Sequence, residues 1–134
     1  LGYRRGTLRW LGTAGAKLDD LLVWLPCRLV TLSLPLVQVR TAQRVLPLAR
    51  RALLEGKPDP SPNAGVSQAI YAQCLGIQLG GVNRYADKTT EKPLLAAGAR
   101  LPEPEDVERL LALSRRLEGL WLLLALLVGA AVHR

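Results

Sequence analysis

DPSPNAGVSQA, residues 59–69, marks the point where a proline-rich loop gives way to a helix. Ser61 is a favourable N-cap, and Pro62 suits the first helical turn because the amide hydrogen that it lacks has no helical partner there. Capping leaves Gly65 unexplained, since glycine inside a helix costs about 1 kcal/mol relative to alanine. A glycine here makes sense if something approaches the backbone closely. Two interpretations follow: a plain helix start, or a helix start whose free amides also bind an anion.

Downstream of this loop the pattern predicts a short helix, a long loop and a long helix. The short helix covers residues 64–77, and its apolar residues share one face. Residues 78–103 have no helical period, so we expect a long irregular polar loop with a short hairpin around residues 85–92. The final helix, residues 104–132, opens on acidic residues that suit its positive end and closes on an uncharged stretch from Leu120 to Val132.

Upstream, residues 4–55 are predicted to be helical, with the proline-rich loop at residues 56–63. An apolar block at residues 21–39 is long enough to cross a bilayer, which takes about 20 residues. Pro26 is expected to interrupt the first helical pattern, and Pro35 and Pro47 to kink or end the second. Gly56, followed by Lys-Pro, is a good helix stop.

Composition points to a membrane rather than to nucleic acid. The net charge is +7, with the excess of lysine and arginine in the N-terminal half. These basic residues are spread between leucines without a recognition module, so nucleic acid is not an expected partner, whereas basic residues flanking membrane segments fit the pattern. The lone histidine and two separated cysteines, Cys27 and Cys74, make a zinc site improbable. The lack of methionine indicates a fragment of a longer chain.

Together these features predict an all-α fold: a helical integral membrane protein with a long irregular polar loop and a short hairpin. Residues 1–134 are expected to form the C-terminal portion of a single membrane-embedded domain, multi-pass in the cell membrane and in contact with its lipid.

Three charged residues in the first half are candidates for chemistry. Asp19 and Asp20 are adjacent carboxylates that suit a divalent cation holding a phosphate. Since neighbouring helix positions point about 100° apart, one Mg²⁺ is expected on one of the two, and a solvated helix face is the alternative. Arg28 lies inside an apolar block, where a guanidinium needs a partner. It either grips a carboxylate or phosphate, or pairs structurally with Asp19, Asp20 or Glu118.

The long loop offers Lys92, either a phosphate-binding lysine or a surface partner of Glu91. Gly80-Gly81 is too generic to be a nucleotide motif, and no phosphate-binding loop of the GxxxxGK[ST] type occurs in the sequence. The single histidine, His133, leaves no Ser/His/Asp or Cys/His set for nucleophilic catalysis.

Four blocks in order make the chain resemble the C-terminal part of the adenosylcobinamide-phosphate synthase family, the membrane-embedded cobalamin-biosynthesis proteins of the CobD/CbiB type. The blocks are LDDLLVWLPCRL (18–29), PSPNAG (60–65), LGIQLGGVNRY (75–85) and EKP (91–93). The resemblance covers roughly residues 15–132. Where the family tends to have asparagine, histidine, tryptophan and tyrosine, this chain has Val23, Asp59, Val66 and Arg84, which bears on substrate preference.

The resemblance implies an ATP-dependent amide ligase that joins aminopropanol, or its phosphate, to adenosylcobyric acid and yields adenosylcobinamide or its phosphate. ATP and Mg²⁺ are then implied, with the corrinoid as substrate. The residues assigned to catalysis are Asp19, Asp20 and Lys92, with Asp20 also the metal ligand. The residues assigned to substrate binding are Arg28, Ser61, Asn63, Gly65, Asn83 and Tyr85. The alternative is a non-catalytic membrane-anchored helical remnant. For the opening stretch, the resemblance favours a helix start that also faces an anionic group, a phosphate or a corrin carboxylate.

Overall fold

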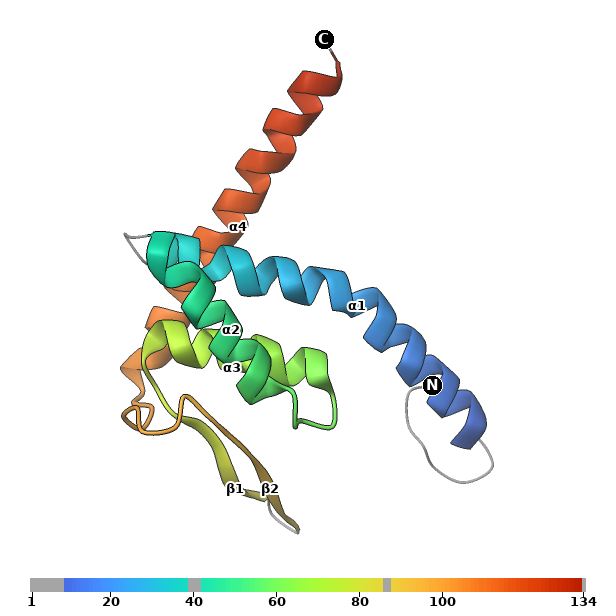
Figure 1. Cartoon of the computed structure of the whole chain (residues 1–134), viewed down its shortest axis with the longest axis vertical. Coiled ribbons are helices and arrows are strands. Elements are labelled where there is room, and N and C mark those ends of the chain that lie inside the picture. Colours follow the sequence, from blue (N-terminus) through green and yellow to red (C-terminus); the bar gives the residue numbers. More distant parts are fainter. Residues whose placement is uncertain (1–8, 39–41, 86–87, 134) are drawn as a thin grey trace.

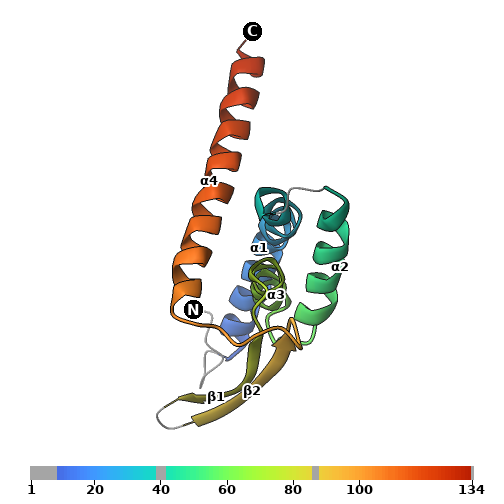
Figure 2. The ribbon, with the colours of Figure 1, turned by 90° about the vertical axis from the view of Figure 1, so that its left-hand side faces the viewer.

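The structure, a computed structural model, describes residues 9–38, 42–85 and 88–133. Helices dominate it, and one small antiparallel sheet is present (Figures 1 and 2). Its elements are α1 (Arg9–Gln38), the 3₁₀ turn η2 (Ala42–Arg44), α2 (Val45–Gly56), α3 (Pro62–Leu75), β1 (Leu79–Tyr85), β2 (Lys88–Leu95) and α4 (Glu105–Val132). The predicted helical character is therefore confirmed, with a hairpin beside it. The predicted start of the first helix, residues 4–8, lies outside the described residues.

The prediction that Pro26 interrupts the first helix is wrong, because α1 runs through both Pro26 and Pro35. A proline inside a helix removes one backbone hydrogen bond and costs about 3 kcal/mol. The face of α1 that packs on α3 compensates, since Cys27, Thr31 and Leu34 on it are at most 3% exposed. Pro47 does not end α2 either. It lies in the first turn of α2, where the missing amide hydrogen has no intrahelical acceptor.

Helix α3 lies at the centre of the molecule, packed against α2 and α1 and touching α4 and both strands (Figure 2). Its apolar residues Val66, Ala69, Ile70 and Cys74 are all buried, as the sequence pattern predicts. Side chains from every other helix and from β2 complete this core, among them Leu34, Ala52, Leu95, Leu113 and Leu117. Helix α3 ends at Gly76, which has the left-handed backbone (φ 67°) that glycine adopts readily, and the Gly76 amide donates to the carbonyl of Ala72.

Two glycines allow the end of α2 to approach the start of α3. A Cβ added to Gly56 would lie 2.5 Å from Cα of Val66, and one added to Gly65 would lie 2.6 Å from Cβ of Asp59 and would overlap the carbonyl oxygen of Gly56. No real Cβ tolerates such separations. The close approach that Gly65 permits is thus, first of all, that of α2.

The segment expected to be an irregular loop is mostly a hairpin, which is longer than the predicted residues 85–92. β1 pairs antiparallel with β2 from Leu79 opposite Leu95 to Tyr85 opposite Lys88. A bulge lies in β2, where Pro93 and Leu94 are opposite the single residue Gly80, whose φ is 88° and where a Cβ would meet the backbone of Pro93. Since Pro93 has no amide hydrogen, the regular ladder is broken at this point. Below the bulge the register places Gly81 opposite Lys92.

Large apolar surfaces remain exposed on the two long helices. The C-terminal half of α4 projects away from the rest of the molecule (Figure 1), and its leucines from Leu122 to Leu127 are 49–64% exposed. Leucines on the outer face of α1 are exposed as well: Leu18, Leu22, Leu25, Leu29, Leu32 and Leu36. Within the described residues one helical segment, Thr13–Gln38, is long and apolar enough to cross a membrane.

Candidate functional site

Asn63, in the first turn of α3, is the buried centre of a partly buried polar network between α1 and α3. Its side-chain oxygen accepts a hydrogen bond from an Nη of Arg28 at 2.5 Å, and its Nδ2 donates to the backbone carbonyl of Asp20 at 2.7 Å. The Cys27 thiol donates to the backbone carbonyl of Asn63 at 3.3 Å. Asn63 is only 6% exposed, so these bonds replace the water that an amide side chain requires. One asparagine therefore fixes α1 to the start of α3.

Ser61 extends this network in two directions. It occupies the N-cap position, as predicted, but its hydroxyl makes no capping bond and lies 3.5 Å from the Asp20 carboxylate. The backbone amide of Ser61 donates to the Asp59 carboxylate at 2.9 Å, a turn that an aspartate two residues earlier commonly makes. Ser61 thus connects a carboxylate on α1 to one in the loop before α3.

Lys92 joins the same network from β2. Its Nζ lies 3.2 Å from the Asp59 carboxylate, and Asp59 is buried while the Lys92 side chain is 35% exposed. The polar connection runs from Lys92 through Asp59 and Ser61 to Asp20, and from Asp20 through Asn63 to Arg28. The surface pairing of Lys92 with Glu91 is not seen. Five predicted site residues, from three separate sequence blocks, are brought together here.

The Arg28 guanidinium group is held by one contact at its edge and another on its face. Asn63 accepts from one Nη, and the guanidinium lies over the ring of Trp24, 5.0 Å from its centroid, in a cation–π contact. No carboxylate pairs with Arg28 in the described part of the chain, so the structural pairing with Asp19, Asp20 or Glu118 is not observed. Its remaining N–H groups leave the fixed cation able to bind a carboxylate or phosphate.

Other predicted residues lie outside this network. Asp19 is exposed and makes no polar contact with the described residues. Gly65 contributes close packing against Gly56. Asn83 lies on β1 opposite Thr90, and its amide donates to the Gly81 carbonyl at 3.3 Å. The alternation along a strand places Asn83 on the same face of the hairpin as Lys92. Tyr85 ends β1, but its side chain lies outside the described part of the structure.

The donor set suits a magnesium ion that is bound partly through phosphate. No group of three or more metal-ligating side chains occurs among the described residues. Among the residues that the structure describes, the Asp20 carboxylate has only the distant Ser61 hydroxyl as a partner, and Asp19 is adjacent in the sequence. Mg²⁺ in enzymes that use phosphate substrates is commonly held by one or two carboxylates plus substrate oxygens. The residues present therefore fit such an ion with Asp20 as the principal ligand.

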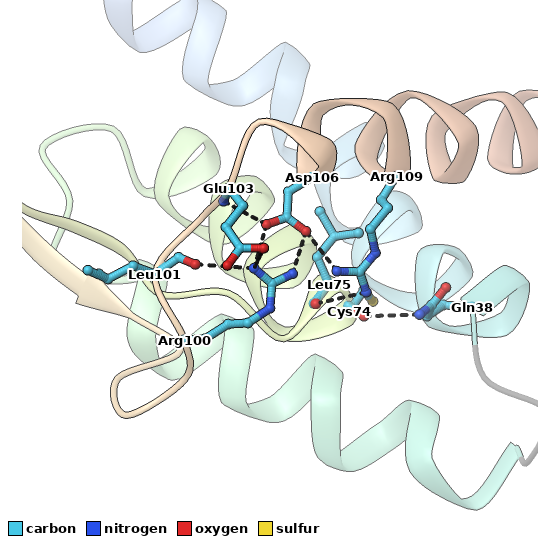
Figure 3. Close-up of polar contacts among 8 residues, drawn as sticks. All are labelled: Gln38, Cys74, Leu75, Arg100, Leu101, Glu103, Asp106 and Arg109. Atoms are coloured by element: carbon cyan, nitrogen blue, oxygen red, sulfur yellow. Dashed lines mark hydrogen bonds and ion pairs between the residues drawn. The ribbon is translucent and has the colours of Figure 1, made fainter.

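A second polar cluster, which sequence reasoning missed, lies at the opposite end of α3 (Figure 3). Asp106, in the first turn of α4, accepts from Arg100 at 2.5 and 2.7 Å, from Arg109 at 2.7 Å and from the backbone amide of Glu103 at 2.9 Å. Arg109 also donates to the carbonyl of Leu75 at 3.4 Å. The cluster fixes the start of α4 to the C-terminal end of α3.

Two groups near this end of α3 have shifted pKa values, for different reasons. Hydrogen bonds from Arg100 hold the pKa of Asp106 well below its usual range, and the Glu103 amide acts in the same direction. Burial in the α3 core raises the pKa of the Cys74 thiol to about 12. Its carbonyl accepts from the Gln38 amide at 3.1 Å (Figure 3). Cys74 is thus an inert, packed thiol.

Some of the missed residues carried local signals. Asp59 precedes Pro-Ser-Pro, and an aspartate that accepts from the amide two residues later is a common turn device. Asp106 lies in an acidic first helical turn, where a carboxylate is favourable. Trp24 and Arg28 are four residues apart on α1 and so face each other. The tertiary partners of Asp59 and Asp106, which are Lys92 and Arg100, had no sequence signal.

Comparison with known proteins gives one consistent result. A family model described as CobD/Cbib protein matches residues 1–114. The cobalamin biosynthesis protein CobD of Synechocystis is 40% identical over 136 residues, which cover 97% of this chain and 39% of that protein. Proteins of the same name from Halalkalibacterium halodurans and Rhodobacter capsulatus are 31% and 35% identical, and the matches cover 42% and 39% of them. The chain spans about two fifths of the length of these relatives. No solved structure matches.

Proposed function

Because the chain belongs to the CobD/CbiB protein family, we propose that it forms part of a cobalamin-biosynthesis enzyme that makes an amide bond. The reaction condenses a propionate side chain of adenosylcobyric acid with aminopropanol or its phosphate. The new bond joins the amine nitrogen to the carboxyl carbon, and one carboxylate oxygen leaves with the γ-phosphoryl group of ATP as inorganic phosphate. The products are adenosylcobinamide or its phosphate, ADP and phosphate.

The observation that carries this proposal is the continuous polar connection from Lys92 to Arg28. It gathers two cations, Lys92 and Arg28, and the Asp20 carboxylate, which has few protein partners, around the first turn of α3. Backbone amides at this helix start also favour negative charge. The reacting groups other than the amine, the propionate carboxylate and the phosphates of ATP, are anionic. A site with fixed cations is therefore suited to hold carboxylate and phosphate in contact.

Each residue has a distinct part in this proposal. Arg28, fixed by Asn63 and Trp24, binds an anionic substrate group with its remaining N–H donors. Lys92 neutralises phosphate charge from the hairpin side. Asp20 would hold Mg²⁺, which would supply charge neutralisation at the phosphates of ATP. Ser61 positions Asp20, and Asn83 and Tyr85 are assigned to substrate contacts along the hairpin.

We also propose that the protein is an integral, multi-pass protein of the cell membrane. The exposed leucines of α1 and of the second half of α4 support this, because monomeric soluble proteins rarely leave such large apolar patches in water. Membranes from cells expressing the full-length protein, washed in high salt, test the point. The protein should stay in the pellet and be released by detergent, whereas release by salt alone would mean electrostatic attachment.

Reconstitution tests the activity. Purified full-length protein in detergent is incubated with adenosylcobyric acid, Mg²⁺-ATP and, in parallel, aminopropanol or its phosphate, and the corrinoid products are identified by mass. We expect a cobinamide product with one amine and equimolar ADP. A protein that is folded and pure but gives no cobinamide with either amine would overturn the proposal and favour the non-catalytic remnant.

A further inference from the structure

We propose that Asp59 is a positioning residue for Lys92, which acts by fixing the hairpin and its lysine beside the first turn of α3; this inference rests on the proposed function. Asp59 is nearly fully buried, at 8% exposed, and its two carboxylate oxygens have different partners. One oxygen accepts from the Ser61 amide at 2.9 Å, and the other lies 3.2 Å from Nζ of Lys92.

The position of Asp59 is itself fixed by packing. Its backbone amide donates to the Gly56 carbonyl at 3.3 Å, and its Cβ lies against Gly65, where a side chain would leave no room. The carboxylate therefore sits on a rigid corner formed by the end of α2 and the start of α3. A long, flexible lysine side chain loses rotamer freedom when it is ordered, and a fixed acceptor is one way to hold it.

The other end of the ion pair comes from a strand that is shaped for this contact. The bulge of β2 at Pro93 and Leu94, opposite Gly80, bends the strand next to Lys92. Elsewhere in the described chain, the hairpin end is tied to α2 by the Ala96 amide, which donates to Glu55 at 2.8 Å. Among the described residues, the Asp59–Lys92 pair is the ion pair that joins a strand to the helical body. Removing the Asp59 charge should free both the lysine and the strand.

The test uses Asp59→Asn in the full-length protein, because asparagine can still accept from the Ser61 amide but carries no charge. Glu91→Gln is the matched control, since Glu91 is an exposed acid beside Lys92 that makes no contact with it in the structure. Hydrogen exchange of the β1 and β2 amides should become about threefold to tenfold faster in Asp59→Asn, as expected when a local contact is lost, and stay unchanged in Glu91→Gln.

Kinetics then separate positioning from mere structure. Asp59→Asn should lower kcat by about tenfold or more, as misplacement of a catalytic group does. When Asp59→Asn is added to Lys92→Met, kcat should fall no further than in Lys92→Met alone. Equal losses in both backgrounds, or unchanged hairpin exchange, would overturn the inference. If the unmodified protein makes no cobinamide, the proposed function fails while hydrogen exchange still decides whether Asp59 fixes the hairpin.

Discussion

Gly65 of α3 lies against Gly56 of α2 with no room for a side chain on either residue. The two backbones meet where the polar network around Asn63 begins, because Asp59 and Ser61 lie in the turn between the two helices. Packing of two helix ends thus determines where the candidate site residues are placed.

Replacing either glycine with alanine should destabilise the protein. The added methyl group would overlap backbone atoms that cannot move independently, so we expect a loss of about 1–3 kcal/mol for Gly65→Ala and for Gly56→Ala. Thermal unfolding in detergent measures this. Gly119→Ala is the control, because nothing lies within 4 Å of a Cβ there, and alanine in a helix interior should raise stability by about 0.4–1 kcal/mol. Equal stability of Gly65→Ala and the native protein would contradict the close packing.

Arg28→Lys should impair substrate use more than folding. Lysine keeps the charge but lacks the planar guanidinium group. It therefore cannot donate to Asn63 and at the same time offer a pair of N–H donors to the substrate. We expect kcat/KM to fall by at least about tenfold, since charge-assisted bidentate contacts are strong. Folded yield is measured alongside, and Arg50→Lys on the exposed face of α2 serves as the control. Native kinetics in Arg28→Lys would remove Arg28 from the site.

The Asp106 cluster predicts a specific dependence of stability on pH. The pKa of Asp106 is lowered in the folded protein from an ordinary value of 3.8, so its contribution is fully present above that value. The contribution is lost as the pH falls below 3.8 toward the lowered folded pKa. Native protein should therefore keep this part of its thermal stability down to pH 3.8 and lose it progressively below that pH.

Asp106→Asn provides the comparison for that dependence. The variant should be less stable at pH 7, because Arg100 and Arg109 lose their charged acceptor, and its stability should fall less on acidification. Parallel curves for the two proteins would show that Asp106 is not the group responsible.

Local sequence signals were sufficient for several elements. Gly56 marks the end of α2, Ser61-Pro62 the start of α3, and the acidic residues the start of α4. These signals work because capping, proline geometry and the helix dipole act within one turn.

The sequence could not predict features that depend on contacts between separate elements. Pro26 does not break α1, because burial of its neighbours on α3 outweighs one lost hydrogen bond. The hairpin is longer than predicted because glycines at a bulge hide the strand pattern. Gly65 indicated that something approaches the backbone closely, and the approaching group in the structure is Gly56, which lies nine positions earlier and on another helix. No single-sequence pattern reports such a partner.

Asn63 provides the most direct test of the account, because it links Arg28 to the Asp20 segment within the proposed site. The measurement is the rate of cobinamide formation per folded molecule for full-length Asn63→Ala, with Gln68→Ala as the control, an exposed amide on the same helix. We predict that this rate falls by about 100-fold or more for Asn63→Ala, because the catalytic groups are then misplaced, and that Gln68→Ala keeps native activity. Native activity in folded Asn63→Ala would contradict the claim that this network is the catalytic site.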